Sequence, residues 1–148
     1  MDRRWLPVRT SVTQTGRMAT NVPESHLDLL DAPIAAFATL GSDQRPQQSL
    51  VWFLFDDGKF RLSLNTARQK TRNLLERPVA DLLIADPSGY RYLEIRGDVT
   101  IEADDDYAFA ETVGAKYGGQ DMRQMDGPGE QRVVVTLEPT RVNAVAMG

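Results

Sequence analysis

The sequence predicts a mainly β fold, in which one antiparallel sheet closes on itself and a few short helices lie in the connections. Apolar or alternating segments of strand length follow one another, and turns rich in Gly, Asp and Pro join them. Neighbouring strands joined by tight turns pair antiparallel, and closure removes free sheet edges. The 148 residues, with 41% hydrophobic and 26% charged side chains, suit one globular domain.

The first 17 residues differ from the rest of the chain. Four arginines stand against one acid there, and the segment has no apolar period. Met18 then opens a stretch that reads like a natural start. We therefore expect an N-terminal extension, 1–17, and one domain, 18–148. The extension is either the product of an upstream start or a flexible arm that packs across a partner subunit.

The first half of the domain predicts a short helix and three strands. An early proline, acids in the first turn and three leucines indicate the helix within 21–33. The Asp57-Gly58 turn indicates a hairpin, because this pair tolerates positive φ. After it, apolar and polar side chains alternate strictly, as in a half-buried strand. The three strands are Ile34–Leu40, Gln47–Phe55 and Lys59–Asn65.

The second half predicts two helices separated by strands. The first helix lies between Thr66, its expected N-cap, and Pro78. Gly97 predicts a bulge or bend in a long strand. The second helix is amphipathic, and Tyr107, Ala110, Val113 and Tyr117 share one face. In order, the remaining elements are the strands Val79–Asp86 and Tyr90–Asp104, the helix 104–118, a Gly-rich loop 118–131, and one long bent strand or a strand pair over 132–147.

Composition excludes several classes of function. The net charge of −4 argues against general binding of nucleic acid or an anionic membrane surface. Without cysteine there is no disulfide, thiolate nucleophile, Fe–S cluster or Cys-based zinc site. With His26 as the single histidine, a His-rich metal site is excluded too. No apolar run approaches the ~20 residues that span a bilayer, and no secretory signal is evident, so we expect a cytoplasmic protein.

A cluster of cations marks the candidate site. Arg68, Lys70, Arg72 and Arg77 fall within ten residues, at the start of the first predicted helix of the second half. The strand before them places Ser63 and Asn65 on one face. Hydroxyls, cations and the N–H groups of a helix start form a cradle for phosphate. Charge alone favours a solvated helix face over such a site.

The segment RPQQSLVWFLFDDGKFRLSLNTARQKTRNLLERPVADLLIAD, Arg45–Asp86, resembles a known family. It is similar to the core of the pyridoxamine 5′-phosphate oxidase-like split β-barrels, and most similar to the actinobacterial branch that uses the deazaflavin F420. The K-T-R-N-L helix start, Lys70–Leu74, after an alternating strand carries the resemblance. More loosely, the similarity extends from about Leu27 to Val142.

The resemblance implies an antiparallel split β-barrel that forms a homodimer, with two equivalent sites at the subunit interface. Tyr90, Tyr92 or Trp52 would then reach a site from the neighbouring chain. It also assigns cofactor-binding roles. Arg68, Lys70, Thr71 and Asn73 would hold the phosphate and the start of the acidic tail; Ser63, Asn65 and Thr66 would contact the ribityl chain and phosphate; Gln48, Ser49, Leu50 and Val51 would line the planar ring.

The implied activity is hydride transfer from reduced F420 to an unsaturated small molecule. Such chemistry needs geometry and a dry pocket more than a reactive side chain, so no residue is assigned as catalytic. The alternatives are an FMN-dependent oxidoreductase of the same fold and a non-catalytic F420-binding protein. FMN-using relatives tend to carry an R-x-x-L-L-K strand and an S-R-K triplet. Here the strand reads QSLVWF and the triplet is Arg68-Gln69-Lys70, which weakens the FMN alternative.

Other polar or aromatic residues have structural and functional interpretations. His26 suits a helix surface or a satisfied core position. The acids at 104–106 suit helix capping better than a metal site, and we expect no bound metal. Trp52 and Phe53 suit core or interface packing, or one ring that faces the cofactor. The Gly-rich loop is either a lid over the substrate or a plain connector.

Overall fold

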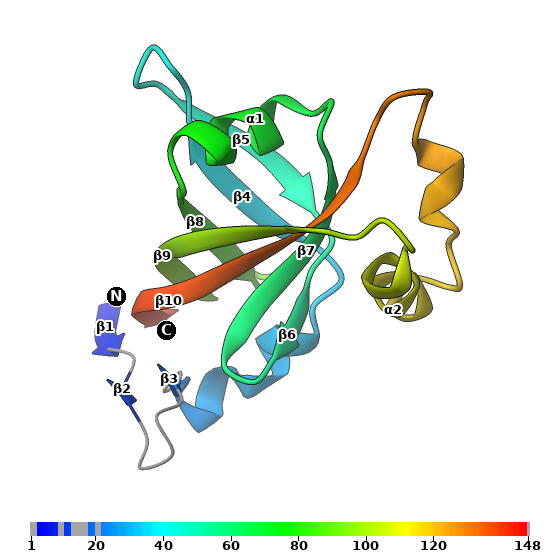
Figure 1. Ribbon diagram of the computed structural model, residues 1–148. Coiled ribbons are helices and arrows are strands. Elements are labelled where there is room, and N and C mark those ends of the chain that lie inside the picture. The colour runs from blue at the N-terminus through cyan, green and yellow to red at the C-terminus, as the bar shows by residue number, and fades with distance from the viewer. Residues whose placement is uncertain (1–2, 9–10, 13–17, 20–21, 148) are drawn as a thin grey trace.

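The computed structural model describes residues 3–8, 11–12, 18–19 and 22–147 (Figure 1). The strands are β1 Arg3–Val8, β2 Ser11–Val12, β3 Met18–Ala19, β4 Ala35–Leu40, β5 Pro46–Val51, β6 Leu54–Asp56, β7 Lys59–Asn65, β8 Val79–Ala85, β9 Arg91–Ala103 and β10 Arg132–Met147. The helices are η1 Glu24–Asp31, α1 Gln69–Glu76, α2 Ala108–Lys116 and η2 Met122–Met125, of which η1 and η2 are 3-10 helices.

The predicted mainly β, antiparallel fold is confirmed. In the part of the chain described, seven strands follow the order β5-β4-β8-β9-β10-β7-β6, and β1 pairs with β10 beside them. All of these pairs are antiparallel. The β6–β7 hairpin also agrees with the prediction, since Asp57 and Gly58 both have positive φ, at 52° and 78°.

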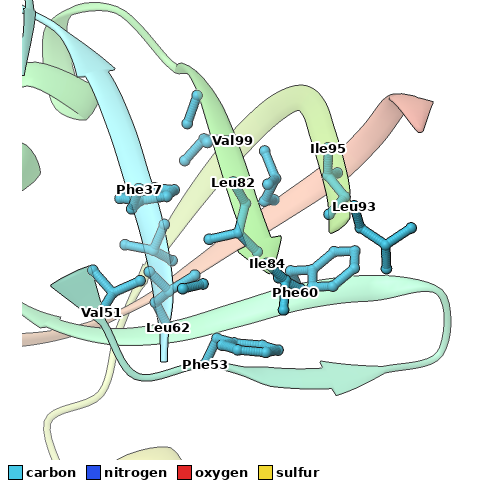
Figure 2. Close-up of a cluster of buried hydrophobic side chains, with 14 of the residues drawn as sticks. Phe37, Val51, Phe53, Phe60, Leu62, Leu82, Ile84, Leu93, Ile95 and Val99 are labelled. Carbon is cyan, nitrogen blue, oxygen red and sulfur yellow. The ribbon is translucent and has the colours of Figure 1, made fainter. Parts of the chain in front are cut away.

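One apolar core fills the space that the sheet encloses. It draws inward-facing side chains from β4, β5, β7, β8, β9 and β10, and Figure 2 shows them converging from facing strands. Phe37, Phe60, Leu82 and Ile84 are at most 1% exposed. Alternation explains this burial, because every second residue of a strand faces the same side.

A second, smaller apolar cluster involves α2 and η2. Figure 1 shows α2 lying beside the sheet. The buried members of the cluster are Ala110, Val113 and Met122, and Trp52 and Leu54 pack against it from the sheet side. We call residues 107–131, which carry α2 and η2, the outer layer. Asp104 caps α2 by accepting hydrogen bonds from the backbone N–H groups of Phe109 and Ala110, so the predicted capping role is confirmed.

The predicted strand Gln47–Phe55 is interrupted at Trp52 and Phe53, which separate β5 from β6. The Phe53 N–H donates to the Tyr117 hydroxyl over 3.1 Å, and its carbonyl accepts from Lys116 Nζ over 2.9 Å. These bonds replace the ladder that a continuous strand would form. The break therefore also anchors the end of α2 to the sheet.

Gly97 does not carry the predicted bulge; the register shift lies opposite, between Pro139 and Arg141 of β10. A Cβ on Gly97 would lie 2.2 Å from the Glu138 carbonyl oxygen, so the glycine permits the close approach of β9 and β10. Arg132–Met147 is one strand, which resolves the two alternatives for the C-terminal segment.

Part of the predicted N-terminal extension pairs with the sheet, because β1 runs antiparallel to Val142–Met147 of β10. Residues 1–2, 9–10 and 13–17 lie outside the described residues. His26 in η1 is fully buried. Its Nε2 donates to the Val145 carbonyl over 2.9 Å, and its Nδ1 forms a hydrogen bond with Ser25 Oγ over 2.7 Å. It is therefore a satisfied core histidine, one of the two predicted interpretations.

Candidate functional site

A pocket of about 220 Å³ lies between the sheet and the outer layer. The sheet contributes the ends of β5 and β7 and the start of β10, and the helix α1 contributes its first turn. The lining residues are Leu50, Val51, Trp52, Ser63, Leu64, Asn65, Arg68, Lys70, Val113, Met122, Met125 and Arg132. The pocket thus combines an apolar wall with a cationic end.

The apolar wall comes from the end of β5 and from the outer layer. Val113, Met122 and Met125 face the pocket from α2 and η2, opposite Leu50 and Trp52. The Trp52 ring stacks on Tyr117, with centroids 4.2 Å apart and planes within 6°. This stack positions the Trp52 indole at the pocket of its own chain. The aromatic ring and the methionines of this wall offer polarizable surfaces on which a flat apolar ligand can pack.

Arg68 and Lys70 form the cationic end. Among the described residues, no carboxylate lies within 4.0 Å of either side chain's nitrogens. Burial lowers the pKa of Lys70, and the neighbouring charge of Arg68 lowers it further. Two adjacent cations that repel each other without an acid between them favour an external anion.

Ser63 supplies a polar atom between the two ends of the pocket. Its Oγ is buried and has no hydrogen-bond partner among the described residues, although Ser63 lines the pocket. Leaving a buried hydroxyl unpaired costs about 1–3 kcal/mol, so such a group indicates a missing partner. A ligand oxygen beside Arg68 and Lys70 would satisfy it.

Six of the predicted cofactor-binding residues therefore line one pocket: Leu50, Val51, Ser63, Asn65, Arg68 and Lys70. Arg72 and Arg77 do not line it. Arg72 bonds Gln69 on the exposed side of α1, and Arg77 bonds the Leu40 carbonyl and Glu76. The cation cluster thus divides into a pocket-facing pair and structural or solvated charges.

Three other predicted residues are used within the protein. The Thr71 hydroxyl donates to the Asn65 carbonyl over 2.8 Å, and the Asn73 amide donates to Thr39 Oγ1 over 3.0 Å. Both residues are at most 2% exposed. Thr66 Oγ1 accepts from the Gln131 N–H. Thr66 is not the N-cap of α1, since Arg68 holds that position and no side chain caps the helix there.

Gln48 and Ser49 lie away from the pocket. Gln48 belongs to a different hollow, on the outer face of β4, β8 and β9, which Tyr92 also lines. Ser49 points to the opposite side of β5 from Gln48, and its buried Oγ has no hydrogen-bond partner in the described part of the chain. Tyr90 is 56% exposed and lies outside both hollows.

The sequence did not identify the contribution of the outer layer or of Arg132. Val113 was assigned to a helix face, and Met122 and Met125 to a loop that was either a lid or a connector. Arg132 opens β10 ahead of three valines. In the structure, Asp126 is its buried ion-pair partner.

Comparison with known proteins agrees with this fold. The sequence profile of the pyridoxamine 5′-phosphate oxidase family matches residues 22–146. A solved structure described as an F420 reductase is 34% identical, with a TM-score of 0.71, over 82% of this chain and 98% of that chain. A conserved hypothetical protein from Mycobacterium tuberculosis is 23% identical, with a TM-score of 0.68, over 84% and 85%.

A third solved structure is described as a pyridoxamine 5′-phosphate oxidase-related, FMN binding protein from Nostoc punctiforme. It is 19% identical, with a TM-score of 0.58, over 80% of this chain and 76% of that chain. At this identity, and at that of the mycobacterial protein, the likeness concerns the fold. None of the helices in the described residues is long and apolar enough to cross a membrane.

Proposed function

This chain belongs to the pyridoxamine 5′-phosphate oxidase family, and we propose that it is an F420-dependent oxidoreductase. In this role it transfers a hydride from the reduced deazaflavin to an unsaturated small molecule. The similarity to an F420 reductase at 34% identity, over 98% of that protein, supports the choice of cofactor.

The observation that carries the proposal is the unpartnered polar end of the pocket. Among the described residues, Ser63 Oγ has no hydrogen-bond partner there and neither Arg68 nor Lys70 has a carboxylate within 4.0 Å, while the opposite wall is apolar. A ligand that satisfies both ends has an anionic part and a flat apolar part. F420 has this composition, with a phosphodiester and a glutamate tail on a deazaflavin ring.

The chain's own residues would bind and orient this cofactor. The guanidinium of Arg68 offers forked donors to a phosphate, and Lys70 offers a point charge. The Ser63 hydroxyl would donate to a ribityl or phosphate oxygen. Leu50, Val51 and Met125 would pack on the ring and exclude water, which protects a hydride donor. The bound deazaflavin itself supplies the hydride.

We also propose that the site is completed by a second copy of the chain in a homodimer. Leu50, which lines the pocket, is 70% exposed, and Leu83 on the outer face of β8 is 40% exposed. The hollow that contains Gln48 and Tyr92 lies on the same outer face. A partner that covers this face would bury these apolar side chains and close the open side of the pocket. The mass of the purified protein in solution tests this part of the proposal.

The cofactor is tested by titrating F420 into the purified full chain and recording tryptophan fluorescence, because Trp52 lines the pocket. We expect quenching that saturates at micromolar ligand, followed by turnover of reduced F420 with a panel of activated alkenes and quinones. Absence of binding would refute the proposal. FMN retained on purification would favour the flavin alternative instead, and binding without turnover across the panel would favour a non-catalytic F420 carrier.

A further inference from the structure

Asp126 joins the outer layer to the sheet, and the proposed cofactor contacts do not include it. Its side chain is 4% exposed, and that of Arg132, its ion-pair partner, is 5% exposed. Oδ2 accepts from Arg132 Nε over 3.2 Å and from the Tyr107 hydroxyl over 2.7 Å. Oδ1 accepts from Arg132 Nη2 and, over 2.6 Å, from Asn65 Nδ2. One carboxylate therefore binds donors from β10, β7 and the start of α2.

Asn65 connects Asp126 to the turn that carries Arg68, at the cationic end of the pocket. Its side-chain Oδ1 accepts from the Ala67 N–H over 2.6 Å, and its carbonyl accepts from the Arg68 N–H over 3.1 Å. Its amide nitrogen donates to Asp126 and, over 3.1 Å, to Glu130. The orientation of the Asn65 side chain thus shapes the turn from β7 into α1. That turn sets where Arg68 and Lys70 lie.

Arg132 connects Asp126 to residues on both sides of the pocket, including the apolar wall. Its guanidinium donates to the Met122 carbonyl in η2 and to the Ser63 carbonyl in β7, each over 3.4 Å. Met122 and Ser63 line the pocket from the outer layer and from the sheet, respectively. The ion pair therefore fixes the spacing between the two sides of the pocket.

We propose that Asp126 is a positioning residue that sets the cationic end and the apolar wall of the pocket relative to each other, through Asn65 and Arg132. The ligand concerned is the one named under the proposed function, on which this inference rests. The geometric part of the proposal can be measured without any ligand, so the two can fail separately.

The informative substitution is Asp126→Asn. A carboxylate accepts at both oxygens, whereas the amide accepts at one and donates at the other. Both carboxylate oxygens accept from Arg132, so either orientation of the amide places a donor opposite the guanidinium. One orientation also places it opposite the Asn65 amide, and the other opposite the Tyr107 hydroxyl. Tyr107→Phe is a milder second variant, because it removes one donor to Asp126 and leaves every charge in place.

Asp104→Asn is the matched control. Asp104 is also buried, at 5% exposure, and it also holds the outer layer, through the N–H groups of Phe109 and Ala110. Its side chain has no hydrogen bond to Asn65 or Arg132. Its backbone N–H donates to the Arg132 carbonyl, and its carbonyl accepts from the Tyr107 N–H, each over 3.0 Å. Asp104→Asn keeps these backbone groups, so it weakens the α2 cap without removing a donor to Asp126 or a side-chain contact of Asn65.

The first measurement compares ¹⁵N–¹H spectra of the ligand-free full chains. We expect Asp126→Asn to shift the Asn65 side-chain amide and the backbone amides of Ala67 and Arg68. Tyr107→Phe should shift them less, and Asp104→Asn should leave them in place. The proposal is overturned if these resonances are unmoved in both Asp126→Asn and Tyr107→Phe, or if the control moves them as far.

The second measurement is a double-mutant cycle on the Kd of F420. Asp126→Asn should weaken binding about tenfold in the wild-type background, but less than about threefold when Arg68→Ala is already present, because its effect passes through Arg68. Asp104→Asn should have the same effect in both backgrounds. Additive effects of Asp126→Asn and Arg68→Ala would contradict the proposal. If the wild-type chain binds no F420, the proposed function fails, and the spectra alone decide the positioning role.

Discussion

The sheet and the outer layer are held in place by different forces. The sheet encloses a core of twenty buried hydrophobic residues, which come from six strands, η1, α1 and the break at Phe53. The outer layer buries Ala110, Val113 and Met122 as its own cluster. The outer layer depends in addition on directional bonds, above all those of Asp126 with Arg132. The pocket lies between the two. Its sheet side is therefore held in place by the burial of many apolar side chains, and its outer-layer side by a few polar contacts.

The largest expected effect on stability follows from breaking the buried ion pair. Arg132→Leu would leave the Asp126 carboxylate buried without its cation, which typically costs about 3–5 kcal/mol. Urea unfolding, followed by circular dichroism, would measure it. A loss below about 1 kcal/mol would show that the outer layer does not depend on this pair and would remove the contrast with the sheet.

The next effect concerns the core of the sheet. Leu82→Ala should lower the free energy of unfolding by about 2–5 kcal/mol, because Leu82 is fully buried among side chains from facing strands. Leu83→Ala is the matched control, since Leu83 is the next residue of β8 and is 40% exposed. Its cost should stay near 0.5 kcal/mol in the isolated chain. Equal losses would contradict the core described in Figure 2.

A smaller effect is expected where β9 and β10 approach closely. Gly97→Ala would place a methyl group 2.2 Å from the Glu138 carbonyl oxygen, so the strands must separate at a cost of about 1–3 kcal/mol. Gly127→Ala in the outer layer is the comparison, because its added Cβ would lie no closer than 3.4 Å to Glu130. Both changes can be followed by thermal unfolding, and a larger loss at Gly127 would reverse the expected order.

The pH dependence of stability should also distinguish the two regions. Burial raises the pKa of Asp126, but donors from Arg132, Tyr107 and Asn65 outweigh it, so the net pKa lies below its ordinary value. A carboxylate whose pKa is lowered by folding stabilises the folded protein at pH values above its pKa in the unfolded chain, near 3.9. This stabilisation is lost as the pH falls through the pKa of the folded state. Unfolding measured from pH 7 to 2 should show this loss in wild type and not in Asp126→Asn. An identical pH profile in both chains would exclude Asp126 as its source.

Sequence patterns predicted local features of the sheet better than the contacts between the sheet and the outer layer. The alternation over Lys59–Asn65 and the Asp57-Gly58 turn are local signals, and the structure agrees with both. The interruption at Phe53 depends on Lys116 and Tyr117, which lie more than sixty residues away in the chain. A local sequence pattern does not contain such contacts. The predicted strand therefore ran through Trp52 and Phe53, where the structure has no strand.

The same distinction applies to the site. Ser63, Arg68 and Lys70 could be predicted because a strand end and a helix start place them together within a few residues. Thr71 and Asn73 belong to the same motif, but their side chains bond Asn65 and Thr39 inside the fold. Arg132 and Met122 approach the pocket from distant parts of the chain. Whether a polar side chain faces the pocket or the interior is decided by these long-range contacts.

The most direct test of the central claim compares two cationic positions of α1. The account predicts that Lys70→Ala weakens F420 binding about tenfold or more, since a charge-assisted hydrogen bond contributes about 1.5–3 kcal/mol and about 1.4 kcal/mol corresponds to tenfold. Arg72→Ala removes an equal charge from the same helix, outside the pocket, and should change the Kd by less than about twofold. Equal effects of the two substitutions would mean that only net charge matters, and the pocket described here would not be the cofactor site.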